Sequence, residues 1–98
     1  MAPVAATAAF PHDHSEPLDQ RTVPTSSGAR PYIEMLNWIA VPSLTGCPAT
    51  AAPIGRTSDN LPVGVEITGP MWEDATPIKF AELLSEEIGC FTAPPGYR

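Results

Sequence analysis

The sequence predicts a small mixed α/β protein whose elements follow the order coil, helix, strand, strand, helix and tail. Three patterns carry this expectation. Val63, Val65 and Ile67 alternate with small or polar residues, which is the period of a half-buried strand. Apolar residues recur at helical spacing over residues 31–41 and again over residues 75–88. With 98 residues, the chain has room for one small domain and a limited core.

The N-terminal third lacks a periodic pattern. Prolines punctuate residues 1–29, so we expect a Pro-rich extended segment there and the structured part of the protein over residues 30–98. Within the extended segment, Ala2–Phe10 has the composition for one short strand.

The run His12-Asp13-His14 invites a metal-binding interpretation. Alternate residues of a strand point the same way, so two imidazoles could share one ion with a third ligand. Glu16 and Asp19 are nearby, but a Pro-rich coil would not hold them rigidly. We therefore expect no metal site. A small metallohydrolase that uses His12 and His14 is kept as a third functional hypothesis, beside the two given at the end of this section.

A stripe of apolar residues predicts a helix over residues 31–41. Pro31 suits the first helical position, and Val41 should end the helix because a residue before proline is biased away from helical backbone. Ile33 and Trp38 lie off the stripe, so the helix needs cover on two faces. The stripe consists of Tyr32, Met35, Leu36, Ile39 and Ala40.

Two short apolar runs predict strands at residues 49–54 and 63–68. The first contains Pro53, which cannot donate a ladder hydrogen bond and so belongs at a strand end or on an unpaired side. The polar residues 56–60 follow Gly55 and predict a hairpin whose loop is longer than the tight two-residue kind.

The last helix is predicted over residues 75–88. Asp74 or Thr76 can cap it, Pro77 is tolerated in its first turn, and Gly89 is a suitable stop. A tail follows. The apolar stripe consists of Ile78, Ala81, Leu84 and Ile88, widened by Phe80 and Leu83, and the solvated face carries Glu82, Glu86 and Glu87.

Charge and cysteine content exclude several classes of function. Eleven acidic and five basic residues give a net charge of −6, which argues against nucleic acid or an anionic membrane as a partner. No run of 18 apolar residues is present, so we expect no membrane span. Cys47 and Cys90 are too few for a disulfide framework, and we interpret them as reduced thiols of a cytoplasmic protein. A catalytic role for Cys47 would need a neighbouring base or cation, which the sequence does not supply.

Several motifs together resemble the C-terminal end of the amidase signature family. The family pattern runs through Thr-Gly-x-Pro-Ala, Pro-x-Gly, Gly-Leu-Pro-Val-Gly-x-Gln and Gly-Pro, followed by Asp and a final helix. The matching stretches are Thr45–Ala49, Pro53–Gly55, Leu61–Pro70 and Asp74. The resemblance covers residues from about 30 to 90 and reaches the first 29 only loosely.

The chain departs from the family pattern at two positions. Asn60 stands where the family usually has glycine, and asparagine tolerates a left-handed backbone, so this change need not break the turn. Glu66 stands where the family often has glutamine. We expect this second change to be a surface-type exchange on the polar face of the strand.

The resemblance implies an α/β/α sandwich built on a large mixed sheet and hydrolysis of carboxamides by a Ser-cis-Ser-Lys triad. In the family, the triad and its Gly-rich oxyanion loop lie upstream of the matched segment. Ser26 and Ser27 lack the flanking glycines of that loop, and we interpret them as a loop leading to a helix. Lys79 lies on the closing helix, where we expect it to face solvent. No catalytic, cofactor-binding or metal-binding residue is therefore assigned in this chain.

The functional hypothesis that follows is the C-terminal portion of an amidase-like hydrolase, acting on non-peptide carboxamide bonds, inactive alone and needing no cofactor. The alternative is a non-catalytic binding or assembly module derived from the amidase fold. The expected partner is the missing N-terminal amidase portion or a second copy of the chain. Neither nucleic acid nor a membrane is expected as a partner.

Overall fold

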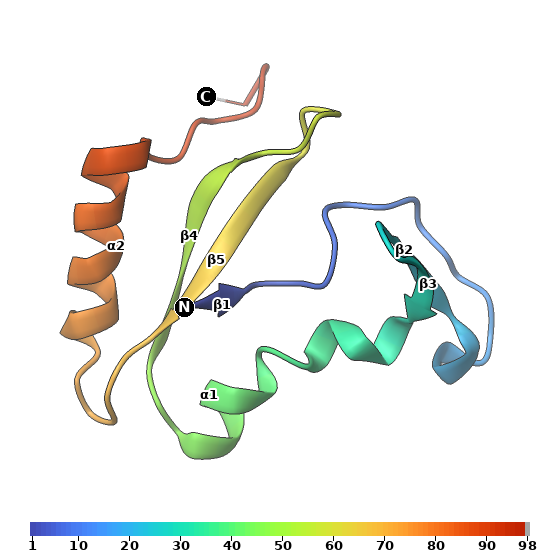
Figure 1. Cartoon of the computed structure of the whole chain (residues 1–98), viewed down its shortest axis with the longest axis horizontal. Coiled ribbons are helices and arrows are strands. Elements are labelled where there is room, and N and C mark those ends of the chain that lie inside the picture. Colours follow the sequence, from blue (N-terminus) through green and yellow to red (C-terminus); the bar gives the residue numbers. More distant parts are fainter. Residues whose placement is uncertain (98) are drawn as a thin grey trace.

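The computed structural model describes residues 1–97 and shows a mixture of helices and antiparallel sheets, which confirms the mixed α/β class. The strands are β1 (Ala2–Pro3), β2 (Thr22–Thr25), β3 (Gly28–Pro31), β4 (Ala49–Arg56) and β5 (Pro62–Thr68). The helices are α1 (Ala40–Thr45), α2 (Ala75–Ile88) and two 3₁₀ turns at Leu18–Gln20 and Tyr32–Leu36. Figure 1 shows β4 and β5 at the centre, with α2 on one side and the β2–β3 hairpin on the other.

The central element is the hairpin formed by β4 and β5. The two strands pair antiparallel over their whole length, and β1 adds two residues to the other edge of β5, giving the order β1-β5-β4. Pro53 lies inside β4, which is an edge strand, and the register shifts between Pro53 and Gly55. Both predicted strands are confirmed, and each extends by one or two residues.

The loop of this hairpin closes with backbone hydrogen bonds. The amide of Thr57 donates to the carbonyl of Leu61 at 2.9 Å, and the amide of Asn60 donates to the carbonyl of Thr57 at 2.9 Å. Asn60 has a φ of 63°, in the left-handed region that asparagine tolerates. Asparagine therefore accommodates the positive φ of this turn.

Helix α2 spans the predicted residues and packs along β4 and β5. Pro77 occupies its first turn, where no helical hydrogen bond is lost, and its ring is among the largest fully buried side chains. The helix ends at Gly89, whose φ of 94° suits glycine. Ile78 and Ile88 of its apolar stripe are 59% and 50% exposed, so α2 covers the sheet with only part of that stripe.

The prediction of one helix over residues 31–41 is wrong. The chain instead forms the 3₁₀ turn Tyr32–Leu36 and then α1, which includes Val41 and continues past Pro42. Pro42 is the third residue of α1, so its missing N–H removes no helical bond and its fixed φ suits a helix start. Packing also disfavours the expected helix, because Ile33 and Trp38 are 58% and 43% exposed and no element buries them. A short helix without such packing is only marginally stable in water.

A second hairpin, β2–β3, was not predicted. Thr25 to Gly28 form its turn, in which the Thr25 hydroxyl donates to the Gly28 carbonyl at 2.7 Å and Gly28 has a φ of 109°. Ser26 and Ser27 therefore lie in a turn between strands, not in a loop that leads directly to a helix. The hairpin spans the boundary expected between residues 29 and 30, and this division into two segments stays a prediction.

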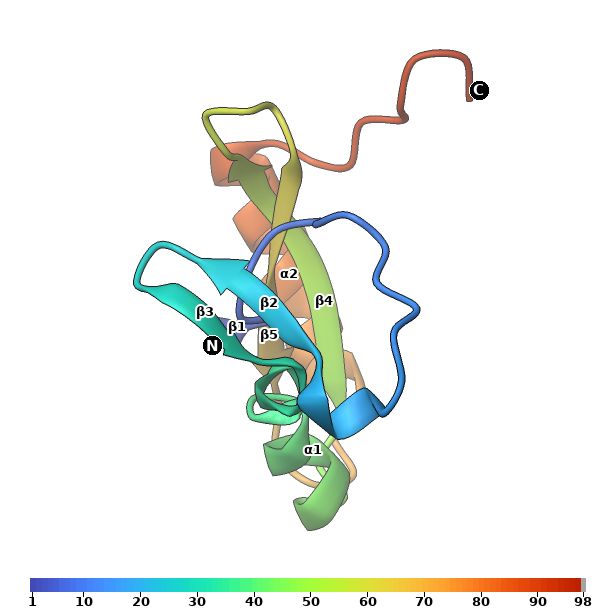
Figure 2. The ribbon, with the colours of Figure 1, turned by 90° about the vertical axis from the view of Figure 1, so that its right-hand side faces the viewer.

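The molecule is loosely packed for its length. Its radius of gyration is 15.3 Å, whereas a compact domain of about 100 residues has about 13 Å. Figure 2 shows the β2–β3 hairpin standing in front of the β4–β5 sheet, with α2 behind that sheet. Among the described residues, the buried hydrophobic side chains are Val23, Ala52 and Ile67. No helix of the described part is both long and apolar enough to cross a membrane.

Candidate functional site

The candidate nucleophiles lie on separate elements. Ser26 and Ser27 occupy the tip of the β2–β3 hairpin, half-buried Cys47 lies between α1 and β4, and exposed Cys90 follows α2. Both cysteines are free thiols. Within residues 1–97, no hydrogen bond joins any of these four side chains to a histidine or a lysine. Over this range, the structure therefore brings no nucleophile together with a base.

The two histidines are exposed and face each other edge to face, with ring centroids 5.8 Å apart. Between them, the Asp13 carboxylate accepts the Ser15 amide at 2.9 Å. Hydrogen bonds from the side chain and then the backbone of Ser15 lower the pKa of Asp13. In the part of the chain that the structure describes, no three His, Cys, Asp or Glu side chains cluster as metal ligands would.

Lys79 lies on the outer side of α2. Its ammonium group contacts the Glu82 carboxylate at 2.8 Å, and its side chain is 60% exposed. The expectation that Lys79 faces solvent is therefore confirmed. Within the described residues, Lys79 forms no hydrogen bond with a candidate nucleophile.

The interpretation of Glu66 as a surface residue on the polar face of the strand is wrong. Glu66 is 8% exposed, so it is a buried residue, not a surface one. The reason is non-local: β5 is the central strand of the sheet, and Glu66 has Ala2 of β1 on one side and Ala51 of β4 on the other. The Thr68 hydroxyl donates to its Oε1 at 3.5 Å, and within the described residues no cationic side chain forms a salt bridge with it.

We expect Glu66→Gln to stabilise the β4–β5 hairpin by about 1 kcal/mol. The amide keeps an acceptor for the Thr68 hydroxyl but removes a buried charge that has no cationic partner among the described residues. Hydrogen exchange should show slower exchange of the β5 amides. Glu87→Gln, which removes the same charge from an exposed position of α2, should leave these amides unchanged. Faster exchange in Glu66→Gln would mean that the carboxylate itself holds the sheet together.

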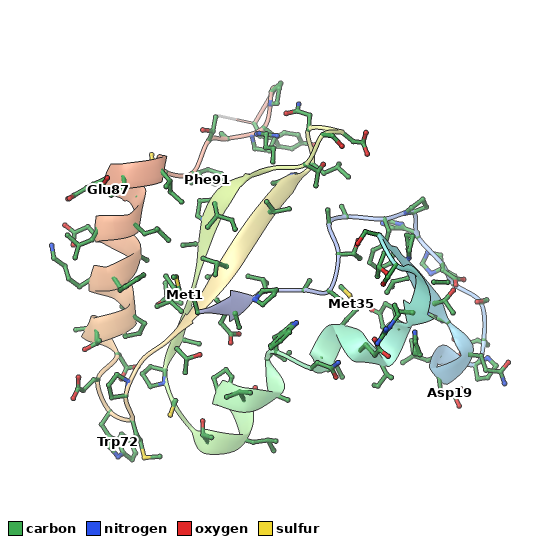
Figure 3. All side chains as sticks on the ribbon, in the orientation of Figure 1. Met1, Asp19, Met35, Trp72, Glu87 and Phe91 are labelled. Carbon is green, nitrogen blue, oxygen red and sulfur yellow. The ribbon has the colours of Figure 1, made fainter. Side chains whose placement is uncertain are left out.

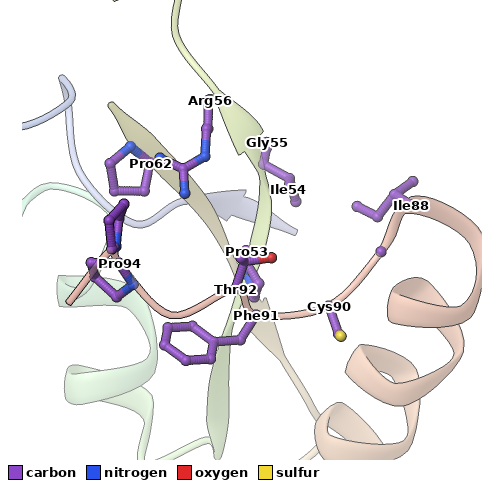
Figure 4. A pocket seen from close by; sticks show the side chains of 12 residues that line it. Pro53, Ile54, Gly55, Arg56, Pro62, Ile88, Cys90, Phe91, Thr92 and Pro94 are labelled. Atoms are coloured by element: carbon purple, nitrogen blue, oxygen red, sulfur yellow. The ribbon is translucent and has the colours of Figure 1, made fainter. Parts of the chain in front are cut away.

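A groove of about 530 Å³ lies between the distal end of the β4–β5 hairpin and the segment after α2. Figure 4 shows Arg56 and Pro62 on one side of it, with Ile88 and Cys90 on the other and Phe91 below. Arg56 donates to the Asn60 carbonyl at 2.9 Å and forms no salt bridge within residues 1–97. Among the described residues that line it there is no histidine, carboxylate or lysine, so over residues 1–97 the groove offers apolar surface and the Arg56 cation but no acid–base pair.

Large apolar side chains are exposed at the end of the molecule opposite this groove. Figures 1 and 2 both show α1 and the loop between β5 and α2 at that end. Trp72 of the loop is 89% exposed, Leu44 of α1 is 87% exposed, and Val41 and Met71 are about half exposed. We call these four residues the Trp72 surface. The sequence expectation placed no functional residue there, although a tryptophan in a short loop was the available signal.

Comparison with known proteins agrees with the sequence motifs. The family model named Amidase matches residues 1–77. The chain is 33% identical over 95 residues to a glutamyl-tRNA(Gln) amidotransferase subunit of Fusobacterium nucleatum, covering 96% of this chain and 17% of that protein. A protein of the same name from Psychrobacter cryohalolentis is 32% identical over 85 residues, covering 87% of this chain and 15% of that protein.

A plant protein gives a further match. A fatty acid amide hydrolase of Arabidopsis thaliana is 31% identical over 62 residues, covering 63% of this chain and 10% of its own length. The chain therefore spans between a tenth and a fifth of the curated relatives named here.

Proposed function

The chain belongs to the amidase family, and we propose that it is the C-terminal portion of an amidase-like hydrolase that acts on carboxamide C–N bonds and is inactive alone. The observation that carries this proposal is the match of an amidase family model to a chain whose described residues bring no nucleophile to a base. Acyl transfer needs a nucleophile, a base and oxyanion donors in one geometry. Those groups would come from the rest of the amidase fold.

The exposed surface supports the proposal. The chain exposes 7347 Å², whereas a compact protein of its mass exposes about 5,400 Å². The excess is roughly 1,900 Å², which is larger than the ~800 Å² that one partner contributes to a standard interface. A surface of this size fits a segment that packs against a large remainder of the same fold.

The test is recovery of activity by combination. The part of the Fusobacterium nucleatum relative outside the matched segment is expressed alone and together with this chain, and ammonia release is followed on a panel of aliphatic and aromatic amides. We expect no release from this chain alone and a clear increase when the two parts are combined. The Cys47→Ala and His12→Ala variants should support the combined activity as well as the unmodified chain does.

Two results would contradict the proposal. Ammonia release by the purified chain alone, lost in Cys47→Ala or His12→Ala, would place the chemistry in this chain. Absence of any gain on combination, together with a folded monomer that binds another partner, would favour the alternative of a non-catalytic binding or assembly module.

A further inference from the structure

Trp72 combines exposure with an unusual backbone. Its side chain is 89% exposed, and its φ is 68°, in the left-handed region that bulky residues rarely adopt. Such a conformation persists only where the surrounding structure imposes it, and it is a frequent feature of functional and contact sites. Figure 3 shows Trp72 at the end of the loop below β5, away from the rest of the chain.

The flanks of the loop explain how this conformation is held. On one side, the Gly69 amide donates to the Pro48 carbonyl at 2.9 Å, which fixes the end of β5 against the chain before β4. On the other side, the Glu73 amide donates to the Pro70 carbonyl at 3.1 Å and the Thr76 amide to the Glu73 carbonyl at 2.9 Å. With both ends fixed, the loop presents the indole outward at a cost in backbone energy.

Other large apolar side chains are exposed at the same end of the molecule, where the loop residues Glu73 and Asp74 are exposed as well. Leu44 is 87% exposed, and Val41 and Met71 are 56% and 49% exposed. The Trp72 surface therefore contains a large aromatic side chain with aliphatic side chains at the same end of the molecule. Tryptophan is enriched among the residues that dominate interface energies, because it buries a large rigid area on docking.

We propose that Trp72 is the anchor by which this chain docks on the remaining portion of the amidase fold, inserting into an apolar pocket there. The inference rests on the proposed function. Two observations point to this partner: the chain spans 17% of the length of its Fusobacterium nucleatum relative, and its exposed area exceeds that of a compact protein by roughly 1,900 Å². A second copy of this chain is a poorer fit than the remaining amidase portion, because two copies that each carry a net charge of −6 repel one another.

The experiment titrates nanomolar chain with the part of the Fusobacterium nucleatum relative outside the matched segment. In the Trp38→Phe variant, Trp72 is the only tryptophan of the chain. It is replaced by 5-hydroxytryptophan, which can be excited at wavelengths that the partner's own tryptophans do not absorb. We expect its emission to shift to the blue on binding. Trp72→Ala should weaken binding at least tenfold, which corresponds to about 1.4 kcal/mol. Trp72→Phe should retain most of the affinity.

Trp72→Gly separates docking from folding. Glycine adopts a positive φ without strain, so this variant should keep or increase the hydrogen-exchange protection of β5 and α2 while losing affinity. Phe91→Ala is the matched control, because Phe91 is 72% exposed and lies at the opposite end of the molecule (Figure 3). It should bind within about threefold of the unmodified chain, well below the tenfold step of 1.4 kcal/mol.

The outcomes distinguish the two proposals. If the unmodified chain shows no binding, the proposed function fails and the docking inference fails with it. If the unmodified chain binds but Trp72→Ala binds equally well, or the emission does not shift, the docking inference alone is overturned. Loss of affinity in both Trp72→Ala and Trp72→Gly, with protection of β5 retained in Trp72→Gly, supports it.

Discussion

At micromolar concentration the isolated chain should be self-associated or partly unfolded, and it should become soluble and ordered when the rest of a related amidase is present. The buried hydrophobic set within the described residues is small: Val23, Ala52 and Ile67. A two-stranded unit is marginal in water by itself, and β1 adds only two residues to the sheet. The net charge of −6 should slow association without preventing it.

Two surfaces favour association. Within the described residues, the outer edge of β4 has no neighbouring strand in the sheet, so its free backbone groups can pair with another chain. Apolar side chains such as Leu44 and Trp72 are also almost fully exposed. Exposed patches of this kind mark interfaces or aggregation sites.

Light scattering and hydrogen exchange on the purified chain test the prediction. We expect scattering from species larger than one chain, or rapid exchange across Val63–Thr68, and we expect both to disappear on co-expression with the remaining amidase portion. Ile54→Lys places a charge on the exposed β4 edge, where Ile54 is 46% exposed, and should reduce the scattering. Ser58→Lys makes the same charge change in the polar loop and should have little effect.

A sharp monomer peak with strong protection across Val63–Thr68 would contradict this expectation. Such a chain would be a self-sufficient domain. This result would favour the hypothesis of a binding or assembly module over that of a hydrolase portion.

The sequence predicted the elements whose signals are local. Alternation at residues 63–67 and the four-residue spacing of the last helix are properties of one segment, and both β5 and α2 appear where these patterns lie. The loop at Asn60 also follows local chemistry, since asparagine tolerates a positive φ. In each of these cases, the neighbouring elements need supply only a surface to pack against.

The elements that depend on distant partners were missed. Residues 31–41 carry a helical stripe, but no element of the described chain covers both of its faces, and the chain breaks it into a 3₁₀ turn and α1. The β2–β3 hairpin is only four residues per strand and contains Pro24, so its pattern resembles coil. Glu66 looked polar and exposed because nothing in the sequence indicated that β1 pairs on the far side of β5.

Replacing Gly69 with alanine should destabilise the packing of α2 on the sheet by about 2 kcal/mol. A Cβ atom built at Gly69 would lie 2.5 Å from Cδ of Pro77 and 3.0 Å from its Cγ. The Pro77 ring is fully buried and rigid, so it cannot move aside as the end of a flexible side chain could. Gly69 cannot retreat either, because its amide donates to the Pro48 carbonyl at 2.9 Å. We expect faster hydrogen exchange throughout α2.

A second substitution tests whether the clash is the cause. Pro77→Ala removes the Cγ and Cδ atoms that the new methyl group would meet, so Gly69→Ala combined with Pro77→Ala should exchange more slowly over α2 than Gly69→Ala alone. The non-additive part of this double-mutant cycle measures the contact between the two positions. If Gly69→Ala leaves α2 protected, or if Pro77→Ala gives no rescue, the close approach of β5 and α2 does not set the position of the helix.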